Sequence, residues 1–414
     1  MIGVPSRRRF LEHCGAVGAA LGAFTSFAKR FGGWRQMTGK PHIVVVGAGA
    51  FGGWTALYLL RGGARVTLLD AWGPGNSRAS SGGETRVIRG TYGPRRIYTH
   101  LTARALALWK EHERRWQRRL YHPIGVLWLV EDDDQYETAA LPILTEAGLA
   151  FERLTGADVA RRYPQINTEQ VRWAILETDA GYLTARAACA AVLAAFQGEG
   201  GDYRQLAARP GALAAAGLRD VALSDGSTLS ADAYVFACGP WLGTLFPDVI
   251  GRHLTPTRQE VFFFGTPPGD ARFTEEALPV WADHGKRFMY GIPGNEWRGF
   301  KVADDTRGPP FDPTSGERIV SSEGLRAARE YLGYRFPALK GAPLVESRVC
   351  QYENSADEGF IIDRHPEAGN LWLVGGGSGH GFKHGPAVGE LVADAVLGRR
   401  EPDATFRLAR FGRF

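Results

Sequence analysis

Cysteine is scarce in this chain: four occur in 414 residues, at Cys14, Cys189, Cys238 and Cys350. They lie far apart and show neither the paired spacing of a disulfide framework nor that of a zinc site. We therefore predict no metal site and expect stability to come from a hydrophobic core. With 44% hydrophobic and 22% charged residues, the chain is typical of a globular protein with two or three structural units.

A uniform charge of one sign is also absent. The formal net charge of +5 comes from basic residues that are dispersed among acids, except in SRRRF at 6–10 and HERRWQRRL at 112–120. The second run has mixed sign at helical spacing, which is typical of a solvated helix face. We therefore expect no nucleic-acid partner.

The apolar run at residues 14–28 is too short for a stable membrane span. It contains fifteen uncharged residues, whereas a helix needs about 20 to cross the hydrocarbon core. The preceding segment, SRRRFLEH at 6–13, resembles a twin-arginine export signal, with Glu12 where a lysine is common. Together they predict a signal peptide at 1–28. We expect the twin-arginine machinery to export the folded protein to the periplasm or beyond, a route that suits an enzyme with a tightly held cofactor.

A glycine-rich turn follows the predicted signal. The β-branched run VVV ends at Gly47 and helical spacing then begins, so GAGAFG lies between a strand and a helix. Gly47 permits a tight turn, Gly49 lets the backbone approach a pyrophosphate, and Gly52 lets the helix pack on the sheet. The next strand pattern ends in Asp70, suitably placed to bind an adenosine ribose. This unit predicts dinucleotide binding, and by itself it fits NAD and FAD equally.

The rest of the chain does not continue as alternating strands and helices. Segments 260–265, 288–293 and 300–304 are typical of strands in a largely antiparallel sheet. Segments 233–241 and 371–398 return to strands that end in glycine, and the second continues into a helix. We therefore predict an α/β plus antiparallel β fold. In it a Rossmann-like nucleotide-binding domain is interleaved with a second domain built on a mixed, largely antiparallel sheet.

Several stretches between residues 42 and 400 resemble one known family. Besides the glycine turn with Asp70, they are GETRVIRGTYG at 83–93, ACGPWL at 237–242, YGIP followed by Lys301, VCQYENSADEGFIIDRHP at 349–366 and GSGHGFKHGPAVGE at 377–390. These stretches are similar to the flavin amine oxidases of the D-amino-acid oxidase superfamily, and most closely to the monomeric sarcosine oxidase and N-methyltryptophan oxidase group.

The resemblance implies FAD as the cofactor and a discontinuous domain organisation. The FAD-binding domain is predicted to comprise 41–95, 171–250 and 346–400. The substrate-binding domain is predicted to comprise 96–170 and 251–345.

Cys350 is the position at which the resemblance implies a covalent cofactor. In that family the matching cysteine is joined through its sulfur to the 8α-methyl group of FAD. Such a tether prevents loss of the flavin and is expected to raise its reduction potential, while the protein supplies position and electrostatics. Cys189 and Cys238 are predicted to pack as small buried groups.

Other positions carry over from the family one at a time. Arg86 resembles an arginine that lies against the flavin, and Arg89 and Lys383 resemble a pair that holds the substrate carboxylate. Lys301 resembles a lysine whose fixed charge assists oxygen as it gains an electron. The further predicted cofactor contacts are Thr85, Gly377, Gly379, His380, Gly381, Phe382 and Lys383 itself. The aromatic residues predicted to line the substrate cavity are Tyr290 and Tyr352.

Asp305 departs from the family pattern. It stands four residues after Lys301, where sarcosine oxidase has an active-site histidine, and a second family histidine aligns with Gly82 or its neighbours. We therefore expect a substrate other than plain sarcosine. An acidic residue here is similar to the fructosyl-amino-acid oxidases and could receive a cationic or hydroxylated group. The alternative is that Asp305 only pairs with Lys301.

The predicted reaction is the oxidation of the C–N bond of an amino acid or a secondary amine. The neutral amine transfers hydride to FAD and leaves as an imine, and oxygen is reduced to hydrogen peroxide. Three alternatives stay open: an exported amine dehydrogenase with a quinone or protein acceptor, a fructosyl-amino-acid-type oxidase, and a catalytically silent flavin-binding partner. Lys301 argues against the dehydrogenase.

Overall fold

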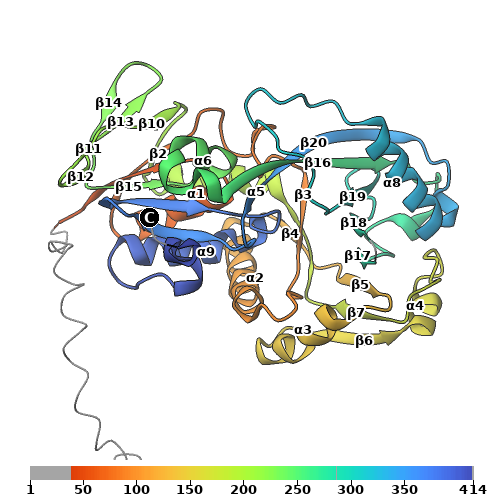
Figure 1. Cartoon of the computed structure of the whole chain (residues 1–414). Helices are drawn as coiled ribbons and strands as arrows, with labels where there is room; N and C mark the ends of the chain where they lie inside the picture. Colours follow the sequence, from red (N-terminus) through yellow and green to blue (C-terminus); the bar gives the residue numbers. More distant parts are fainter. Residues whose placement is uncertain (1–38, 286, 413–414) are drawn as a thin grey trace, which may run out of the picture. The chain divides into compact units, whose positions relative to one another are not determined.

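The computed structural model describes residues 39–285 and 287–412, and the signal predicted at 1–28 lies outside these residues. The chain from Lys40 onward forms one compact unit, which two large sheets organise (Figure 1). Among the residues described, no helix is both long and apolar enough to cross a membrane.

The first large sheet has six strands and carries the glycine-rich turn at the end of a central strand. In spatial order the strands are β21 (Ile361–His365), β22 (Ala368–Gly375), β15 (Ala233–Phe236), β1 (His42–Val46), β2 (Arg65–Leu69) and β9 (Asp202–Arg204). All neighbouring strands are parallel except β21 and β22. This sheet confirms the Rossmann-like part of the predicted fold.

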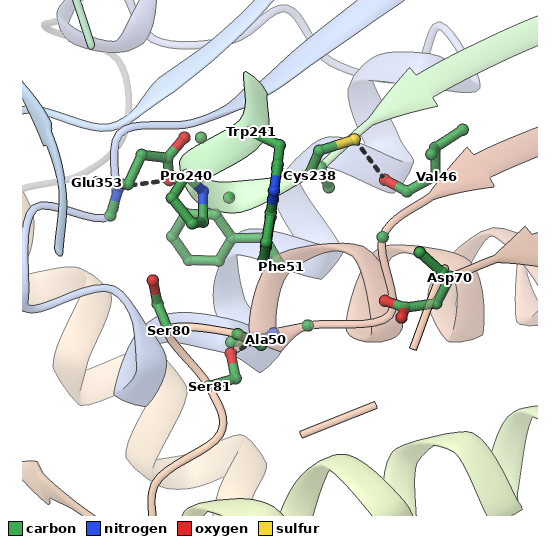
Figure 2. A pocket seen from close by; sticks show the side chains of 18 of the residues that line it. Val46, Ala50, Phe51, Asp70, Ser80, Ser81, Cys238, Pro240, Trp241 and Glu353 are labelled. Carbon is green, nitrogen blue, oxygen red and sulfur yellow. Dashed lines mark hydrogen bonds between the residues drawn. The ribbon is translucent and has the colours of Figure 1, made fainter. Parts of the chain in front are cut away.

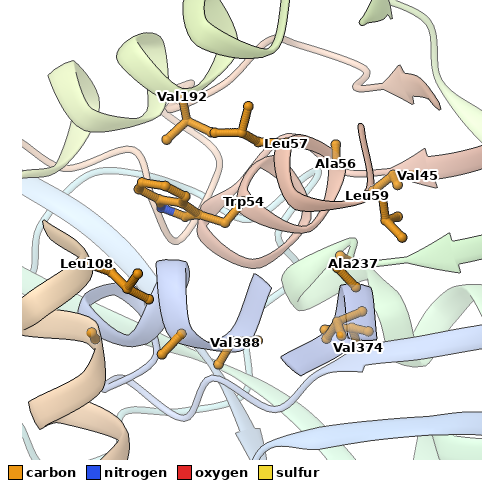
Figure 3. Close-up of a cluster of buried hydrophobic side chains, with 14 of the residues drawn as sticks. Val45, Trp54, Ala56, Leu57, Leu59, Leu108, Val192, Ala237, Val374 and Val388 are labelled. Atoms are coloured by element: carbon orange, nitrogen blue, oxygen red, sulfur yellow. The ribbon is translucent and has the colours of Figure 1, made fainter. Parts of the chain in front are cut away.

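Both faces of this sheet are buried, because alternate side chains of β1 pack into two different hydrophobic clusters. Ile43 and Val45 belong to one hydrophobic cluster, part of which Figure 3 shows, whereas Val44 and Val46 belong to another. Successive residues of a strand point to opposite faces, so a strand covered on both sides is apolar throughout. The helices that contribute to the first cluster are α1 (Ala50–Arg61), α2 (Arg96–Trp116), α5 (Ala185–Gly198) and α9 (Gly385–Val396). A small sheet contributes to the second, with strands β10 (Ala208–Pro210), β13 (Val221–Leu223) and β14 (Thr228–Leu229).

The second large sheet has eight strands. In spatial order they are β20 (Leu344–Ser355), β16 (Leu254–Phe264), β19 (Phe300–Asp304), β18 (Phe288–Ile292), β17 (Val280–His284), β5 (Val126–Val130), β7 (Trp173–Glu177) and β6 (Phe151–Thr155). Only β17 and β5 are parallel, and every other neighbouring pair is antiparallel. The prediction of a mixed, largely antiparallel sheet is confirmed.

The core of the second sheet is rich in aromatic rings. Phe336, just beyond helix α8 (Ser322–Arg335), packs against Phe300 and Trp281 with ring centroids 4.9 and 5.1 Å away. The remaining helices are α3 (Gln135–Glu146), α4 (Gly156–Arg162), α6 (Leu242–Leu245) and α7 (Pro247–Ile250). Two small sheets complete the fold, one of β3 (Thr85–Ile88), β8 (Gly181–Thr184) and β4 (Tyr121–His122), the other of β11 (Leu213–Ala214) and β12 (Gly217–Leu218).

Strands from both large sheets lead to the predicted site residues. Strand β20 runs beside β16 over most of its length and carries Cys350 and Tyr352 (Figure 1). Strand β19 carries Lys301, β3 carries Arg86, and the chain beyond β22 carries the glycine motif that begins at Gly377. Strand β7 lies within the segment predicted to bind FAD, yet it pairs in the eight-stranded sheet. The division into two domains stays a prediction.

Candidate active site

The turn after β1 can be built only with glycine at two positions. Gly47 has φ +104°, and a Cβ there would lie 2.3 Å from the carbonyl oxygen of Ala237. A Cβ on Gly52 would lie 1.9 Å from the carbonyl oxygen of Gly47. Both contacts are far closer than atoms tolerate, so the backbone packs where a side chain would be. At the N-terminus of α1 the N-cap residue is Gly49, which has no side chain to cap the helix. Ala50 N–H donates to the Ser81 hydroxyl at 3.1 Å, and the next N–H groups are left available to an anion.

Asp70 lies at the end of β2, as the sequence predicts. Its carboxylate accepts hydrogen bonds from the backbone N–H groups of Ala48 (2.8 Å), Trp72 (2.9 Å) and Gly73 (2.8 Å). Burial raises the pKa of Asp70, although these three bonds oppose the shift. The carboxylate is therefore fixed beside the glycine turn, where it can accept hydrogen bonds from hydroxyl groups.

A cavity of about 710 Å³ extends from the glycine turn to the predicted flavin residues. Its wall includes Asp70, Phe51 and Glu353, and Figure 2 shows Asp70 and Glu353 on different sides of the cavity. The predicted cofactor residues that line it are Gly47, Gly49, Asp70, Arg86, Gly377, Gly379, Gly381 and Phe382. This volume suits an extended organic ligand.

Glu353 shows that this cavity is built for a polar ligand. Its side chain is 6% exposed, and its Oε1 has no hydrogen-bond partner among the described residues. Its Oε2 accepts only a long bond, 3.4 Å, from the N–H of Gly377. Burial raises the pKa of Glu353 to about 7. A buried polar atom without a partner is costly, so the cavity needs a ligand that carries hydroxyl or N–H groups. The glycine cradle, Asp70 and Glu353 together fit FAD.

A smaller cavity of about 60 Å³ adjoins the large one and shares part of its wall. The shared residues are Arg86, Tyr352, Gly379 and Phe382. The structure brings the predicted substrate residues together here, since the wall also contains Arg89, Tyr290, Lys301, Asp305, His380 and Lys383. Apolar side chains such as Val126, Trp281 and Phe288 complete it.

Cys350 lies half-buried on β20 beside Arg86. The Nη2 atom of Arg86 is 3.7 Å from the Cys350 sulfur. The same guanidinium donates to the carbonyl oxygens of Thr85 (2.8 Å) and Ser80 (2.5 Å), which fixes it at the boundary of the two cavities. The next residues along β20, Gln351 and Tyr352, line the large cavity. The thiol is therefore placed close to both predicted cofactor contacts and the substrate cavity.

Lys301 is buried, at 4% exposure, without a carboxylate partner in the described part of the chain. Its Nζ donates to the carbonyl oxygen of Thr85 at 3.2 Å and lies 5.7 Å from the centre of the Tyr290 ring. Burial, helped by the nearby charge of Arg86, lowers the pKa of Lys301 to about 7. A lysine in this state responds strongly to any negative charge that forms beside it.

Asp305 is held by Tyr352 and not by Lys301. The Tyr352 hydroxyl donates to Oδ1 of Asp305 at 2.6 Å. Within residues 39–285 and 287–412, Lys301 and Asp305 form no ion pair, so the alternative of simple pairing finds no support. Burial raises the pKa of Asp305, and the charges of Arg89 and Lys383 counteract part of that shift.

Arg89 is positioned by aromatic rings and by a carboxylate that the sequence did not indicate. Its guanidinium lies 4.4 Å from the ring centre of Tyr92 and 4.9 Å from that of Trp128. Glu177 accepts hydrogen bonds from Gly90 N (2.5 Å), Thr91 N (3.1 Å) and Trp128 Nε1 (2.9 Å). Glu177 thereby fixes both the turn after Arg89 and the Trp128 ring that contacts the Arg89 guanidinium. Glu177 ends an apolar strand and lies 87 residues after Gly90 in the chain. No local sequence pattern therefore connects Glu177 with Arg89.

Lys383 lies within the 3-10 helix η5 (Phe382–His384) and is buried, with 3% exposure. Its Nζ donates to the Tyr92 hydroxyl at 2.8 Å and to the His380 carbonyl at 2.9 Å. Burial and the neighbouring Arg89 lower the pKa of Lys383 well below its ordinary value. Tyr92 stands inside the quoted motif GETRVIRGTYG, but nothing in the motif itself gives it a role.

The two other described cysteines differ from each other. Cys189 is buried in α5, as predicted. Cys238 was predicted to pack as a small buried group within a strand. It does pack against the core cluster that contains Val46, but it is only half-buried, follows β15 and lines the large cavity. Its thiol lies 3.5 Å from the carbonyl oxygen of Val46. Among the described residues, no three metal-ligating side chains are grouped as a metal site.

The family to which this chain belongs follows from its sequence match. The model of the FAD-dependent oxidoreductase family matches residues 42–395, which is most of the chain. The protein is therefore a member of this family, and the predicted resemblance is confirmed.

Particular relatives carry amino-acid oxidase names. The chain is 30% identical over 380 residues to the monomeric sarcosine oxidase of Bacillus sp. (strain B-0618), covering 87% of this chain and 93% of that protein. It is 29% identical over 388 residues to the N-methyl-L-tryptophan oxidase of Salmonella heidelberg (strain SL476), covering 90% and 99%.

Solved structures confirm the fold. L-Proline dehydrogenase from P. horikoshii has a TM-score of 0.79 at 19% identity, covering 90% of this chain and 98% of that chain. Amadoriase I, a fructosyl amine:oxygen oxidoreductase from Aspergillus fumigatus, has a TM-score of 0.73 at 22% identity, covering 89% of each chain.

Proposed function

We propose that this protein oxidises the C–N bond of an N-substituted amino acid with FAD and reduces oxygen to hydrogen peroxide. The observation that carries the proposal is the small cavity at the wall of the FAD-sized one, where Arg89 and Lys383 converge. Two basic groups in a desolvated cavity favour a ligand that brings a carboxylate. The relatives named sarcosine oxidase and N-methyl-L-tryptophan oxidase support a substituted amine beside that carboxylate.

FAD, when bound, supplies the hydride acceptor and passes the electrons of the substrate on to oxygen. The chain's own residues hold and orient the reactants. The Arg89 guanidinium lies close to the rings of Tyr92 and Trp128, which orient it toward the substrate carboxylate. Lys301 places a group able to carry positive charge beside Arg86, at the cavity boundary, where oxygen gains negative charge. Its presence supports oxygen over a quinone or protein acceptor.

Asp305 is proposed to select the substituent on the amine. It lines the small cavity with one oxygen committed to the Tyr352 hydroxyl. The second oxygen can accept from a cationic or hydroxylated group. We therefore propose a basic or polyol-bearing N-substituted amino acid in preference to sarcosine.

The proposal is tested by measuring oxygen uptake and peroxide release with both kinds of substrate. Peroxide formed in a one-to-one ratio with oxygen supports an oxidase, and amine oxidation by a quinone alone contradicts it.

Cys350 is proposed to bind the flavin covalently, which gives a prediction. Acid-precipitated wild-type protein should stay yellow, because a thioether survives denaturation, whereas precipitated Cys350→Ala should be colourless. The matched control is Cys238→Ala, which removes a thiol that lines the large cavity and should keep its colour. A colourless precipitate from flavin-loaded wild type would contradict the tether.

Export of the folded protein is proposed from the sequence of residues 6–13. Changing Arg7 and Arg8 together to lysine should leave the precursor in the cytoplasm, as judged by fractionation and immunoblotting. The control is Arg9→Lys, which changes the neighbouring basic residue outside the pair and should be exported normally. Normal export of the double variant would show that another signal directs the protein.

A further inference from the structure

The hydroxyl of Tyr92 lies at the centre of a buried polar cluster behind the small cavity. It is 2.8 Å from Lys383 Nζ, 2.7 Å from His384 Nε2 and 3.1 Å from His380 Nδ1. Tyr92 and Lys383 are each 3% exposed and His384 is fully buried. Binding a carboxylate accounts for Lys383, and contact with Arg89 accounts for the Tyr92 ring, but neither accounts for the Tyr92 hydroxyl or the two histidines.

One contact at the surface sets the direction of the hydrogen bond between Tyr92 and His380. His380 Nε2 lies 3.0 Å from the carbonyl oxygen of Glu358, and a carbonyl can only accept, so Nε2 carries the proton. Burial lowers the pKa of His380 and of His384 well below the ordinary value, so both imidazoles are neutral. In a neutral imidazole the second nitrogen accepts, and His380 Nδ1 therefore accepts from the hydroxyl of Tyr92.

The remaining bonds of Tyr92 follow from its capacity. A hydroxyl donates one hydrogen and accepts two. Because Tyr92 donates to His380, it accepts from Lys383 Nζ, and its remaining acceptor position faces His384 Nε2. Burial raises the pKa of Tyr92 above its ordinary value, so it remains a phenol. The cluster is therefore an ordered series, in which Lys383 donates to Tyr92, Tyr92 to His380, and His380 to Glu358 at the surface.

The outer end of this series reaches solvent. Glu358 is in a turn with φ +60°, and its side chain, 50% exposed, pairs with Arg95 and Arg307. His380 itself is partly exposed. The inner end, Lys383, lines the small cavity, and the His380 ring reaches both this cavity and the surface. Three side chains thus connect the proposed amine site with the surface without a gap in the described structure.

We propose that Lys383, Tyr92 and His380 form a proton exit path that deprotonates the bound substrate ammonium group. An N–H bond of the ammonium breaks as an N–H bond forms on the Lys383 amine. Lys383 then passes a proton to the Tyr92 oxygen as Tyr92 passes its own to His380 Nδ1. Because the Glu358 carbonyl cannot take a proton, His380 Nε2 releases its proton to a solvent water when the hydrogen bond to that carbonyl opens. No electrons move in this step. The substrate becomes the neutral amine that can subsequently release a hydride.

The charges around Lys383 make it a suitable first acceptor. Arg89 faces it as a permanent cation, and like charges in a buried site favour the neutral amine. The carboxylates that face it are Asp305 and Glu177, both already engaged by hydrogen bonds. Arg95, at the outer end, likewise disfavours a lasting charge on His380. When a substrate carboxylate reaches Arg89, it cancels part of that positive field, and Lys383 becomes more basic as the ammonium arrives.

This inference rests on the proposed function, and its test uses the flavin-loaded enzyme mixed anaerobically with an N-substituted amino acid. Tyr92→Phe should slow flavin bleaching by about 100-fold near neutral pH, the lower end of general acid–base effects. The defect should shrink toward none as the pH rises past the pKa of the substrate amine, because the substrate then arrives already neutral. His380→Ala should show the same pattern and should be accelerated by added imidazole, which can replace the lost ring at the surface.

Tyr98→Phe is the matched control. The Tyr98 ring lies 5.3 Å from that of Tyr92 and 5.0 Å from that of His380, but its hydroxyl accepts from Phe360 N and stands outside the series. This variant should bleach at the wild-type rate at every pH. If Tyr92→Phe and His380→Ala are slow by a factor that does not change with pH, or match wild type throughout, the path is wrong. If no amine bleaches wild type, the proposed function fails first.

Discussion

Replacing Arg89 with glutamine should lower kcat/KM for the amino acid substrate by about 30-fold to several thousand-fold. This range corresponds to the ~2 to 5 kcal/mol that is typical for loss of one partner of a buried charge pair. Arg89 is held by stacking on Tyr92 and Trp128, so its charge is already oriented before the carboxylate arrives. Glutamine keeps a polar group of similar length and removes the charge.

The decarboxylated form of the same substrate provides the control for Arg89. Wild type should oxidise this amine slowly, because it lacks the group that Arg89 binds. Arg89→Gln should oxidise it no more slowly than wild type does. A variant that loses the same factor with both compounds would show that Arg89 supports the structure of the cavity and does not bind a carboxylate.

Lys301→Met should slow flavin re-oxidation by oxygen about 100-fold or more. Removing one preorganised electrostatic group at a reacting centre typically costs this much. Methionine is close in size, so the buried packing of a side chain with 4% exposure is retained. Anaerobic reduction by the amine should change little, and stopped-flow absorbance separates the two half-reactions. Unchanged re-oxidation would favour the dehydrogenase alternative.

The rate of flavin re-oxidation should also depend on pH through the protonation of Lys301. Its pKa is lowered to about 7 by burial, so the charged form is present below that pH and is lost as the pH rises. Wild-type re-oxidation should therefore decline with rising pH, with a midpoint at or above about 7 because negative charge on reduced flavin favours the protonated lysine. Lys301→Met should show no such decline. Lys110→Met, which removes a half-buried lysine that pairs with Asp179, should keep both the rate and the pH profile of wild type.

Local patterns explain why much of the fold could be predicted. The requirement for glycine at Gly52 and the positive φ of Gly47 arise from a strand, a turn and a helix that are consecutive in the chain, although Gly47 also contacts the distant Ala237. The short runs rich in aromatic and other apolar residues that form β16, β18 and β19 are likewise local. Lys301 and Lys383, in contrast, were identified only through resemblance, because nothing near them in the sequence shows that both face one cavity.

Residues that act across the fold could not be predicted in this way. Glu177 acts on a turn that lies 87 residues earlier, and Glu353 is unusual only because burial leaves one oxygen without a partner. Tyr92 gains its role from His380 and Lys383, nearly 300 residues further along the chain. Such roles depend on contacts between distant segments, and no short pattern records them.

The most direct test of the account is an anaerobic titration of the flavin-loaded protein with amines. We expect at least one N-substituted amino acid to bleach the long-wavelength flavin band, its decarboxylated analogue to bleach it far more slowly, and admission of oxygen to restore the band with release of hydrogen peroxide. A flavin that stays oxidised with every N-substituted amino acid would contradict the account.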